Sequence, residues 1–226
     1  MLDKNEIASN INKLLGKSSA MRSKYLLNLK RYFDNPTLGW DALDNSDTGW
    51  GLYEYDDSDN NPSINVIKSC IDTLTSSISD SKVRPYFCTV NGSFNEVVAV
   101  KQAQDFFDYI YDDKDINHKG TEIFRDACIF GRGHFFINPV TCEINRAYPW
   151  QVYLMPNEVS YNKLTRMYYE RTFFPTYLLP KELQKEVSGN TCTYGLYFDT
   201  VNETCAAVIN NSIKSISKYE KEVIPL

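Results

Sequence analysis

Histidine and the common catalytic motifs are scarce in this sequence. Among 226 residues there are only two histidines, His118 and His134. No Gly-x-Ser-x-Gly, His-Glu-x-x-His or phosphate-loop lysine motif occurs, so the usual sites of serine hydrolases, zinc proteases and nucleotide-binding enzymes are missing. One alternative pairs His134 with Cys128 or Asp126 as a base and a nucleophile. The favoured interpretation is an ordinary strand residue beside a packed thiol, so we expect no catalytic residue, no cofactor and no enzymatic activity.

Metal-binding patterns are missing as well. No two of the six cysteines are spaced as Cys-x-x-Cys, which predicts scattered, reduced core thiols. Asp112, Asp113 and Asp115 lack the central glycine and the twelfth-position glutamate of a calcium loop. The acids of residues 56–59 are typical of a solvated loop. We therefore expect no metal site.

Long apolar runs are also absent. No stretch approaches the roughly 20 apolar residues of a membrane-spanning helix. The first residues, MLDKNEIASNINKLLGK, lack the apolar core of a secretion signal. We expect a soluble protein that is made in a cytosol and does not bind membranes. The net charge of −5 and the pI of about 5.1 disfavour bulk electrostatic binding of nucleic acid.

Charge is unevenly distributed over the first sixty residues. Residues 1–33 hold seven Lys or Arg and two acids, whereas residues 34–61 hold eight acids and no Lys or Arg. Aromatic residues are interleaved with the basic ones, so one alternative is contact with nucleic-acid phosphates. We favour the other alternative, in which the basic block pairs with the acidic block of the same or an adjacent subunit.

The acidic block is rich in turn-forming residues and contains two Gly-Trp pairs. This composition predicts an extended arm whose aromatic side chains anchor on a neighbouring subunit, because aromatic residues dominate the energetics of interfaces. The candidate anchors are Trp40, Trp50, Tyr53 and Tyr55. We expect residues 1–61 to form a basic helix and an acidic arm, and residues 62–226 to form a separate domain.

Helical periodicity dominates the first part of that domain. Ile67, Ile71, Leu74 and Ile78 recur at i, i+4, i+7 and i+11, which predicts one apolar stripe on a helix. Two more helices are expected, at about residues 96–112 and from residue 117 to Gly131. Residues 134–226 contain segments typical of strands, among them 166–173, a two-residue repeat in which Met167, Tyr169, Arg171 and Phe173 form one face and Arg166, Tyr168, Glu170 and Thr172 the other. The predicted fold class is α+β, with helices over 62–131 followed by antiparallel strands over 134–226.

The sequence Gly131-Arg132-Gly133 separates these two parts. A phosphate-binding Gly-x-Gly follows a strand and opens a helix, whereas here a helical pattern comes first and the strand formers His134 to Ile137 come second. Glycine at a helix end accepts the left-handed cap conformation. We therefore interpret Gly131 and Gly133 as a structural turn.

Several segments, taken in order, resemble the portal (head–tail connector) proteins of tailed bacteriophages. NVIKSCIDTLTSSIS followed by KVRPYFCTV looks like the portal helix that leads into an extended segment. KQAQDFFDYIYDDKDINHKGTEIFRDACIFGRGHFFIN looks like the helix pair that closes on a Gly-x-Gly turn into a strand. CEINRAYPWQVYLMPNEVSYNKLTRMYYERTFFP and YGLYFDTVNETCAAVINN look like the strands that follow. The resemblance covers roughly residues 62–226 and lies in the order and spacing of these segments.

The resemblance implies a structural protein. Portals are rings, usually of twelve subunits, at one vertex of the capsid, where they meet the major capsid protein. They conduct double-stranded DNA during packaging and ejection, dock the terminase, and bind tail adaptor proteins. They have no catalytic centre of their own. The implied location is the portal vertex of the virion, after synthesis in the host cytoplasm.

The sequence departs from the family in its length. Portal chains continue after the strands into long stem helices and a crown, whereas no pattern after residue 176 predicts a long helix. We expect a portal wing-like region that is part of a larger portal fold. The alternatives are another virion structural protein, such as a head-completion adaptor or a minor capsid protein, and a small cytosolic hydrolase.

Overall fold

The computed structural model describes residues 2–35, 38–39, 64–79, 84–90, 92–138, 143–155, 158–159, 164–219 and 224–226. The candidate anchors Trp40, Trp50, Tyr53 and Tyr55 lie outside these residues, and so does the boundary expected between residues 61 and 62. That boundary therefore stays a prediction. The chain forms two compact units, of which the first combines Met1–Asn65 with Tyr148–Pro225 and the second spans Val66–Ala147.

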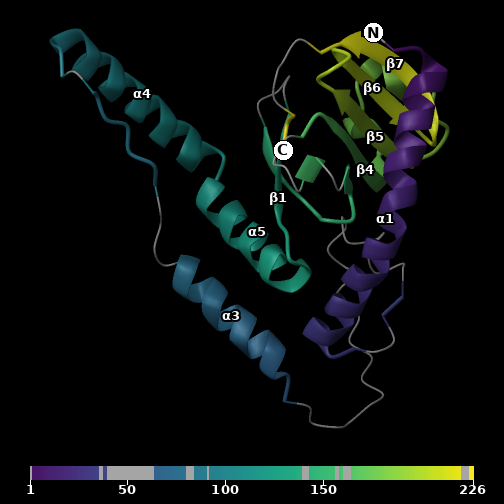
Figure 1. Cartoon of the computed structure of the whole chain (residues 1–226), viewed down its shortest axis with the longest axis horizontal. Helices are drawn as coiled ribbons and strands as arrows, with labels where there is room; N and C mark the ends of the chain where they lie inside the picture. Colours follow the sequence, from purple (N-terminus) through teal and green to yellow (C-terminus); the bar gives the residue numbers. More distant parts are fainter. Residues whose placement is uncertain are drawn as a thin grey trace. The chain divides into compact units, whose positions relative to one another are not determined.

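The order of elements confirms the α+β class with helices first and antiparallel strands second (Figure 1). The long helices are α1 (Lys4–Phe33), α3 (Val66–Ser79), α4 (Phe94–Asp113) and α5 (Ile116–Phe130). The strands are β1 (His134–Ile137), β2 (Ile144–Ala147), β3 (Val152–Leu154), β4 (Arg166–Pro175), β5 (Thr191–Asp199), β6 (Thr204–Ile209) and β7 (Ser212–Lys218). Short helices, η2 (Thr176–Leu178) and α7 (Lys181–Gln184), connect β4 to β5.

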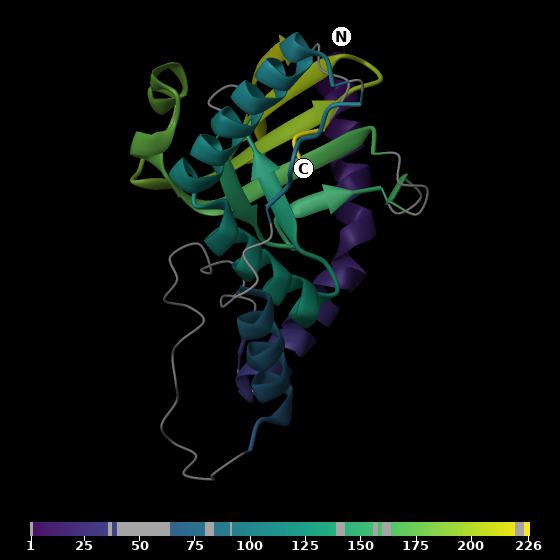
Figure 2. The same cartoon turned by 90° about the vertical axis from the view of Figure 1, so that its left-hand side faces the viewer.

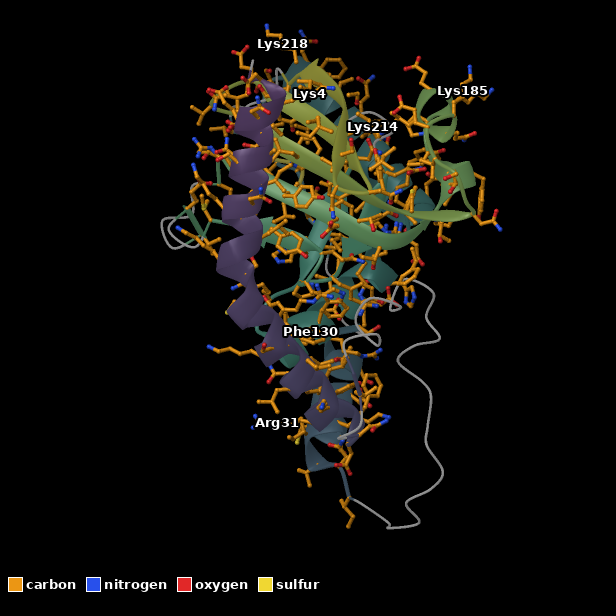
Figure 3. All side chains as sticks on the ribbon, turned by 90° about the vertical axis from the view of Figure 1, so that its right-hand side faces the viewer. Lys4, Arg31, Phe130, Lys185, Lys214 and Lys218 are labelled. Carbon is orange, nitrogen blue, oxygen red and sulfur yellow. The ribbon has the colours of Figure 1, made fainter. Side chains whose placement is uncertain are left out.

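The first unit is a five-stranded sheet with α1 across one face (Figures 1 and 2). The helix begins at a capping box, in which the Asp3 side chain accepts from the backbone N–H of Glu6 at 2.7 Å. Ile7, Ile11 and Leu14, which recur at i, i+4 and i+7, are buried against the sheet. The helix ends at Asp34, which adopts the left-handed conformation. Figure 3 shows Lys4 and Arg31 near its two ends.

The sheet has the order β3-β4-β5-β6-β7, and every neighbouring pair is antiparallel. A row of tyrosines crosses it, because Tyr153 faces Tyr168 across the first strand pair and Tyr168 faces Tyr197 across the next. These tyrosines pack with Ile7, Ile11 and Leu14 of α1. A second apolar cluster contains Leu179, Leu183, Cys192, Ala207 and Ile209. Met167, Tyr168 and Tyr169 of β4 follow one another and are all buried, so this part of the strand is covered on both faces and does not show the predicted two-residue alternation.

The second unit combines α3, α4 and α5 with the hairpin of β1 and β2, in which His134 lies opposite Ala147. Its buried apolar residues are few: Ile71, Tyr111, Ile123, Phe130, Phe136 and Ala147. The helix predicted from the spacing of Ile67, Ile71, Leu74 and Ile78 is present as α3, but its apolar stripe is not a core face. Only Ile71 of the stripe is buried, beside Thr75, while Ile67, Leu74 and Ile78 are exposed by 43–54%.

Candidate subunit interface

The Gly131-Arg132-Gly133 corner lies between α5 and β1. Gly131 has φ of 79° and is the C-cap of α5, and its N–H donates to Ala127 O at 2.9 Å. A Cβ at Gly133 would collide with the backbone oxygen of Ile123. Each glycine is therefore required by backbone geometry, one by a left-handed cap and the other by close packing on the helix.

Asp126, one of the candidate catalytic acids, is committed to an ion pair. It is 1% exposed on α5, and Arg146 of β2 donates to it through Nε (2.6 Å) and Nη2 (2.5 Å). Burial raises the pKa of the Asp126 carboxyl, and the two bonds from Arg146 oppose that rise. The carboxylate thus serves as the link between a helix and a hairpin.

His134 and Cys128 do not form a reactive pair with it. In the part of the chain that the structure describes, no hydrogen bond joins His134 to Asp126 or Cys128, and the buried His134 Nε2 has no partner. Burial, with a smaller effect of Arg132, lowers the pKa of His134 to about 4. Burial also raises the pKa of the Cys128 thiol. At neutral pH both groups are uncharged, and the thiol is not activated.

Asp199 is the second fully buried carboxylate, and it organises the turn between β5 and β6. It accepts from Tyr197 Oη (3.0 Å), from the backbone N of Asn202 (2.9 Å) and from Asn202 Nδ2 (2.8 Å). Arg166, its cross-strand neighbour, lies 3.3 Å away through Nε. All these contacts are internal, so the cluster holds the end of β5 to the turn that follows it and to β4.

Two of the three acidic residues considered for calcium form ion pairs with basic side chains, and the third lies before α5. Asp112 pairs with Arg84 at 2.6 Å and Asp113 pairs with Lys114 at 2.8 Å, while Asp115 is the left-handed residue before α5. Among the described residues, no group of three His, Cys, Asp or Glu side chains is placed to hold a metal ion. The acids of residues 56–59 lie outside the described residues.

The five described cysteines are free thiols. They agree with the prediction of scattered reduced thiols, except that Cys70 and Cys88 are exposed and so are not core residues.

The most unusual surface of the second unit is apolar. Its exposed large apolar side chains are Val66, Ile67, Leu74, Ile78, Tyr86, Phe87, Val90, Phe94, Val97, Val98, Phe106, Tyr109 and Ile137. Single exposed apolar residues are normal, but contiguous sets on a small unit mark interaction sites. Two helices carry most of this set, α3 and α4, and each is treated as a separate surface below.

On α3, the surface consists of Ile67, Leu74 and Ile78, and we name it the α3 stripe. At 100° per residue these three side chains point within 40° of one another. They lie next to the face that packs on α5 through Ile71 and Thr75. The stripe is therefore a solvent-exposed apolar surface beside the face of α3 that contacts α5.

Alongside α4 runs the segment 84–90, which is held by side chains. Gln104 accepts from the backbone N of Phe87 at 3.0 Å, and Phe87 meets Phe107 edge to face at 5.7 Å. Arg84 lies over the Tyr111 ring at 5.0 Å and pairs with Asp112. One face of α4 is therefore occupied by this segment, and the opposite face is left exposed.

Sequence reasoning placed the helices but missed these exposed faces. The apolar residues of α4 do not keep to one stripe, since Phe107 and Tyr111 lie on one side and Phe94, Val98 and Tyr109 on the other. A helix that is apolar on two sides is typically covered on both. The two-sided distribution of apolar residues in the sequence of α4 was therefore the pattern that could have indicated an exposed apolar face.

No helix among the described residues has the length and apolar character needed to cross a membrane. Neither a scan against protein-family models nor a search of the curated proteins finds a match to this chain.

Proposed function

We propose that this chain is a structural subunit of a ring-shaped assembly of the phage-portal type. The observation that carries the proposal is the α3 stripe, which leaves Ile67, Leu74 and Ile78 exposed on a unit with a small core. Burying such side chains against a neighbouring subunit is favourable by about 25 cal/mol per Å² of apolar surface. The order of helices and antiparallel strands is compatible with this class.

The polar groups of the chain support a structural role. Asp126 and Asp199, the fully buried carboxylates of the described residues, are both engaged in internal ion pairs and hydrogen bonds. His134 is neutral and makes no bond through Nε2 to a described residue. Hydrolase chemistry would need a base within hydrogen-bond reach of a nucleophile, and the residues considered for it do not provide that geometry.

The partners follow from the resemblance in the sequence. A ring of the portal type would contact the major capsid protein, dock the terminase and tail adaptors, and pass double-stranded DNA at one vertex of the virion. The number of subunits would be twelve, as is usual in that family. A head-completion adaptor or a minor capsid protein also presents apolar contact surfaces, so it is the second candidate.

Native mass and particle shape test the proposal. Light scattering and negative-stain imaging of the purified chain, over a range of concentrations and salt, should show closed rings with a central hole. Heterologous contacts between identical subunits close into such rings. Particles without a hole, or only monomers and dimers under every condition, would contradict the ring.

A variant on the α3 stripe tests the surface itself. Leu74→Glu should prevent ring formation, because it places a charge in the proposed contact. Ser76→Glu is the matched control, since Ser76 is exposed on the same helix and points about 160° away from Leu74. Equal assembly of the two variants would exclude the α3 stripe as the contact.

A further inference from the structure

One exposed side of α1 carries a row of cations, and we name it the α1 stripe: Lys13, Lys17, Lys24 and Arg31. At 100° per residue these four side chains point within 40° of one another. The row lies about 115° round the helix from the side that packs on the sheet. None of the four takes part in an ion pair among the described residues. The helix therefore presents a line of positive charge that the described chain does not neutralise.

The α1 stripe is long and regularly spaced. From Lys13 to Arg31 it extends about 27 Å along the helix axis. Glu6 points in the same direction one heptad before Lys13, but it belongs to the capping box, in which it accepts from the backbone N of Asp3 at 3.3 Å. An anionic partner of the stripe must therefore carry several charges along an elongated shape.

An acidic part of the same chain begins and ends beside this helix. After α1 the backbone N of Asn35 donates to Lys30 O at 3.0 Å, and Leu38 is buried. On the return, Asn65 Nδ2 donates to Arg31 O at 3.1 Å and to Tyr32 O at 2.8 Å. Both ends of the intervening chain are thus tied to the C-terminal end of α1.

Residues 40–63, which lie outside the described residues, form the sequence between these two ties. They contain seven Asp or Glu and no Lys or Arg, and we name them the acidic segment. Opposite charges therefore adjoin in the chain, four unpaired cations on the helix and seven acids in the segment that follows it.

The spacing of acids in this segment matches the spacing of the cations. Its first three acids, Asp41, Asp44 and Asp47, recur every three residues, and three residues of extended chain span about 10 Å. The last three cations of the stripe recur every seven residues of helix, which is about 10.5 Å. One acid can therefore meet each of these cations in turn.

The chain is also long enough to run back along the helix. Asp47 comes eight residues after Gly39, so it can lie up to about 27 Å from that residue. Lys17 is about 21 Å from Arg31 along the axis. The first three acids can thus reach the last three cations without moving either tie.

We propose that the acidic segment docks on the α1 stripe of its own chain, with Asp41 beside Arg31, Asp44 beside Lys24 and Asp47 beside Lys17. Its own segment fits better than that of a second copy, because a tethered segment has an effective concentration in the mM range. Each exposed ion pair is weak alone, so the docking depends on several pairs that form together.

This pairing goes beyond the proposed ring, because it forms within one chain and does not require assembly. It also gives the acidic segment a role. While the acids neutralise the α1 stripe, its cations are not available to the phosphates of nucleic acid.

Carbodiimide crosslinking of the full chain tests the pairing, since it joins a lysine to a carboxylate only where the two are in contact. Mass spectrometry should find amide bonds between Lys24 and Asp44 and between Lys17 and Asp47. In a mixture of ¹⁴N and ¹⁵N chains at about 1 μM, where a tethered segment outcompetes another copy, each bond should join residues of one isotope. Their yield should fall in about 1 M salt, where the Debye length is about 3 Å.

Charge exchange in the same assay tests the register. Lys24→Glu should lower the yield of the bond between Lys17 and Asp47 by about fivefold, because an attractive pair beside it becomes repulsive. Adding Asp44→Lys should restore that yield and create an amide bond between positions 24 and 44. Lys30→Glu is the matched control: it makes the same charge change on the same helix, but Lys30 points at least 100° away from the stripe. It should leave the yield unchanged.

Three results would overturn the proposal. Bonds between ¹⁴N and ¹⁵N chains would assign the α1 stripe to the segment of another copy. Equal yields for Lys24→Glu and Lys30→Glu, or no bonds at all, would show that the stripe is not the docking site. Binding of a short duplex DNA by the unchanged chain, lost in Lys17→Gln/Lys24→Gln, would assign the stripe to nucleic acid. Absence of rings with the bonds within one chain retained would contradict only the proposed function.

Discussion

Arg146 on β2 holds the buried carboxylate of Asp126 on α5 through two parallel hydrogen bonds, of 2.6 Å and 2.5 Å. Arg146 is also within 3.6 Å of Glu122, one turn earlier on the same helix. This pair joins the helical part of the second unit to its hairpin. Because Asp126 is 1% exposed, its carboxylate depends on Arg146 rather than on water for its hydrogen bonds.

Replacing Arg146 by Met should lower the free energy of unfolding by about 3 kcal/mol, because it leaves an unpaired buried charge. The double variant Asp126→Leu/Arg146→Met should recover most of that loss, since neither charge then remains. Urea denaturation followed by circular dichroism measures both. Arg125→Met is the control: its partner Asp72 is 3.9 Å away and the two side chains are 43% and 42% exposed, so the loss should stay under about 1 kcal/mol. Equal losses for the two arginines would show that Asp126 needs no partner.

Replacing two glycines near the α5–β1 corner by alanine should change the stability of the chain in opposite directions. Gly133→Ala should destabilise the chain by about 1–3 kcal/mol, because the new Cβ collides with the backbone of Ile123. Gly120→Ala should stabilise it by about 0.5–1 kcal/mol, since Gly120 lies inside α5 and its Cβ would meet only Phe135 at 3.9 Å. Thermal unfolding of both variants gives the comparison. A Gly133→Ala variant as stable as the unchanged chain would refute the tight packing at this corner.

Substitutions in the cluster around Asp199 should lower the stability of the chain by different amounts. Tyr197→Phe removes one hydroxyl bonded to Asp199 at 3.0 Å, at a cost of about 1 kcal/mol. Asp199→Ala should cost roughly 3 kcal/mol, because it leaves Arg166 without its ion-pair partner and the N–H of Asn202 without its acceptor. Chemical denaturation of both variants measures the order. As a control, Lys218→Met breaks a pair with Glu203 that is 59% exposed on each side, so its effect should be within the noise. An Asp199→Ala variant no less stable than Tyr197→Phe would contradict the central role of the carboxylate.

Periodicity in the sequence identifies the buried face of a helix where one element of the same chain covers one face. Ile7, Ile11 and Leu14 recur at i, i+4 and i+7 on α1, and the side they form packs on the tyrosine row of the sheet. The same kind of spacing on α3 predicted a stripe, but the helix buries only Ile71 of it. Periodicity records that a face is apolar and does not record which surface, in this chain or another, covers it.

Sequence patterns do not predict ion pairs and hydrogen bonds between residues that are far apart in the chain. Asp126 and Arg146 are separated by 20 positions, and Asn10 reaches Tyr197 across 187 positions at 3.3 Å. Such pairs depend on how α5 docks on the hairpin and how α1 docks on the sheet. The catalytic alternative shows the same limit, since Asp126 is close to His134 in sequence but bonds to Arg146 instead.

His134 gives the unit a defined dependence on pH. Burial lowers its pKa from 6.5 to about 4 in the folded chain, so protonation favours the unfolded state. The stabilisation associated with neutral His134 is fully present above pH 6.5 and is lost as the pH falls from 6.5 towards 4, by up to about 3 kcal/mol. Urea midpoints at several pH values between 7.5 and 4.5 should show this decline. Because carboxylates also titrate at the acid end, the informative quantity is the difference between the unchanged chain and His134→Gln. That difference should vary over this pH range. A His134→Gln difference that does not vary with pH would mean that the imidazole is solvated in the folded chain.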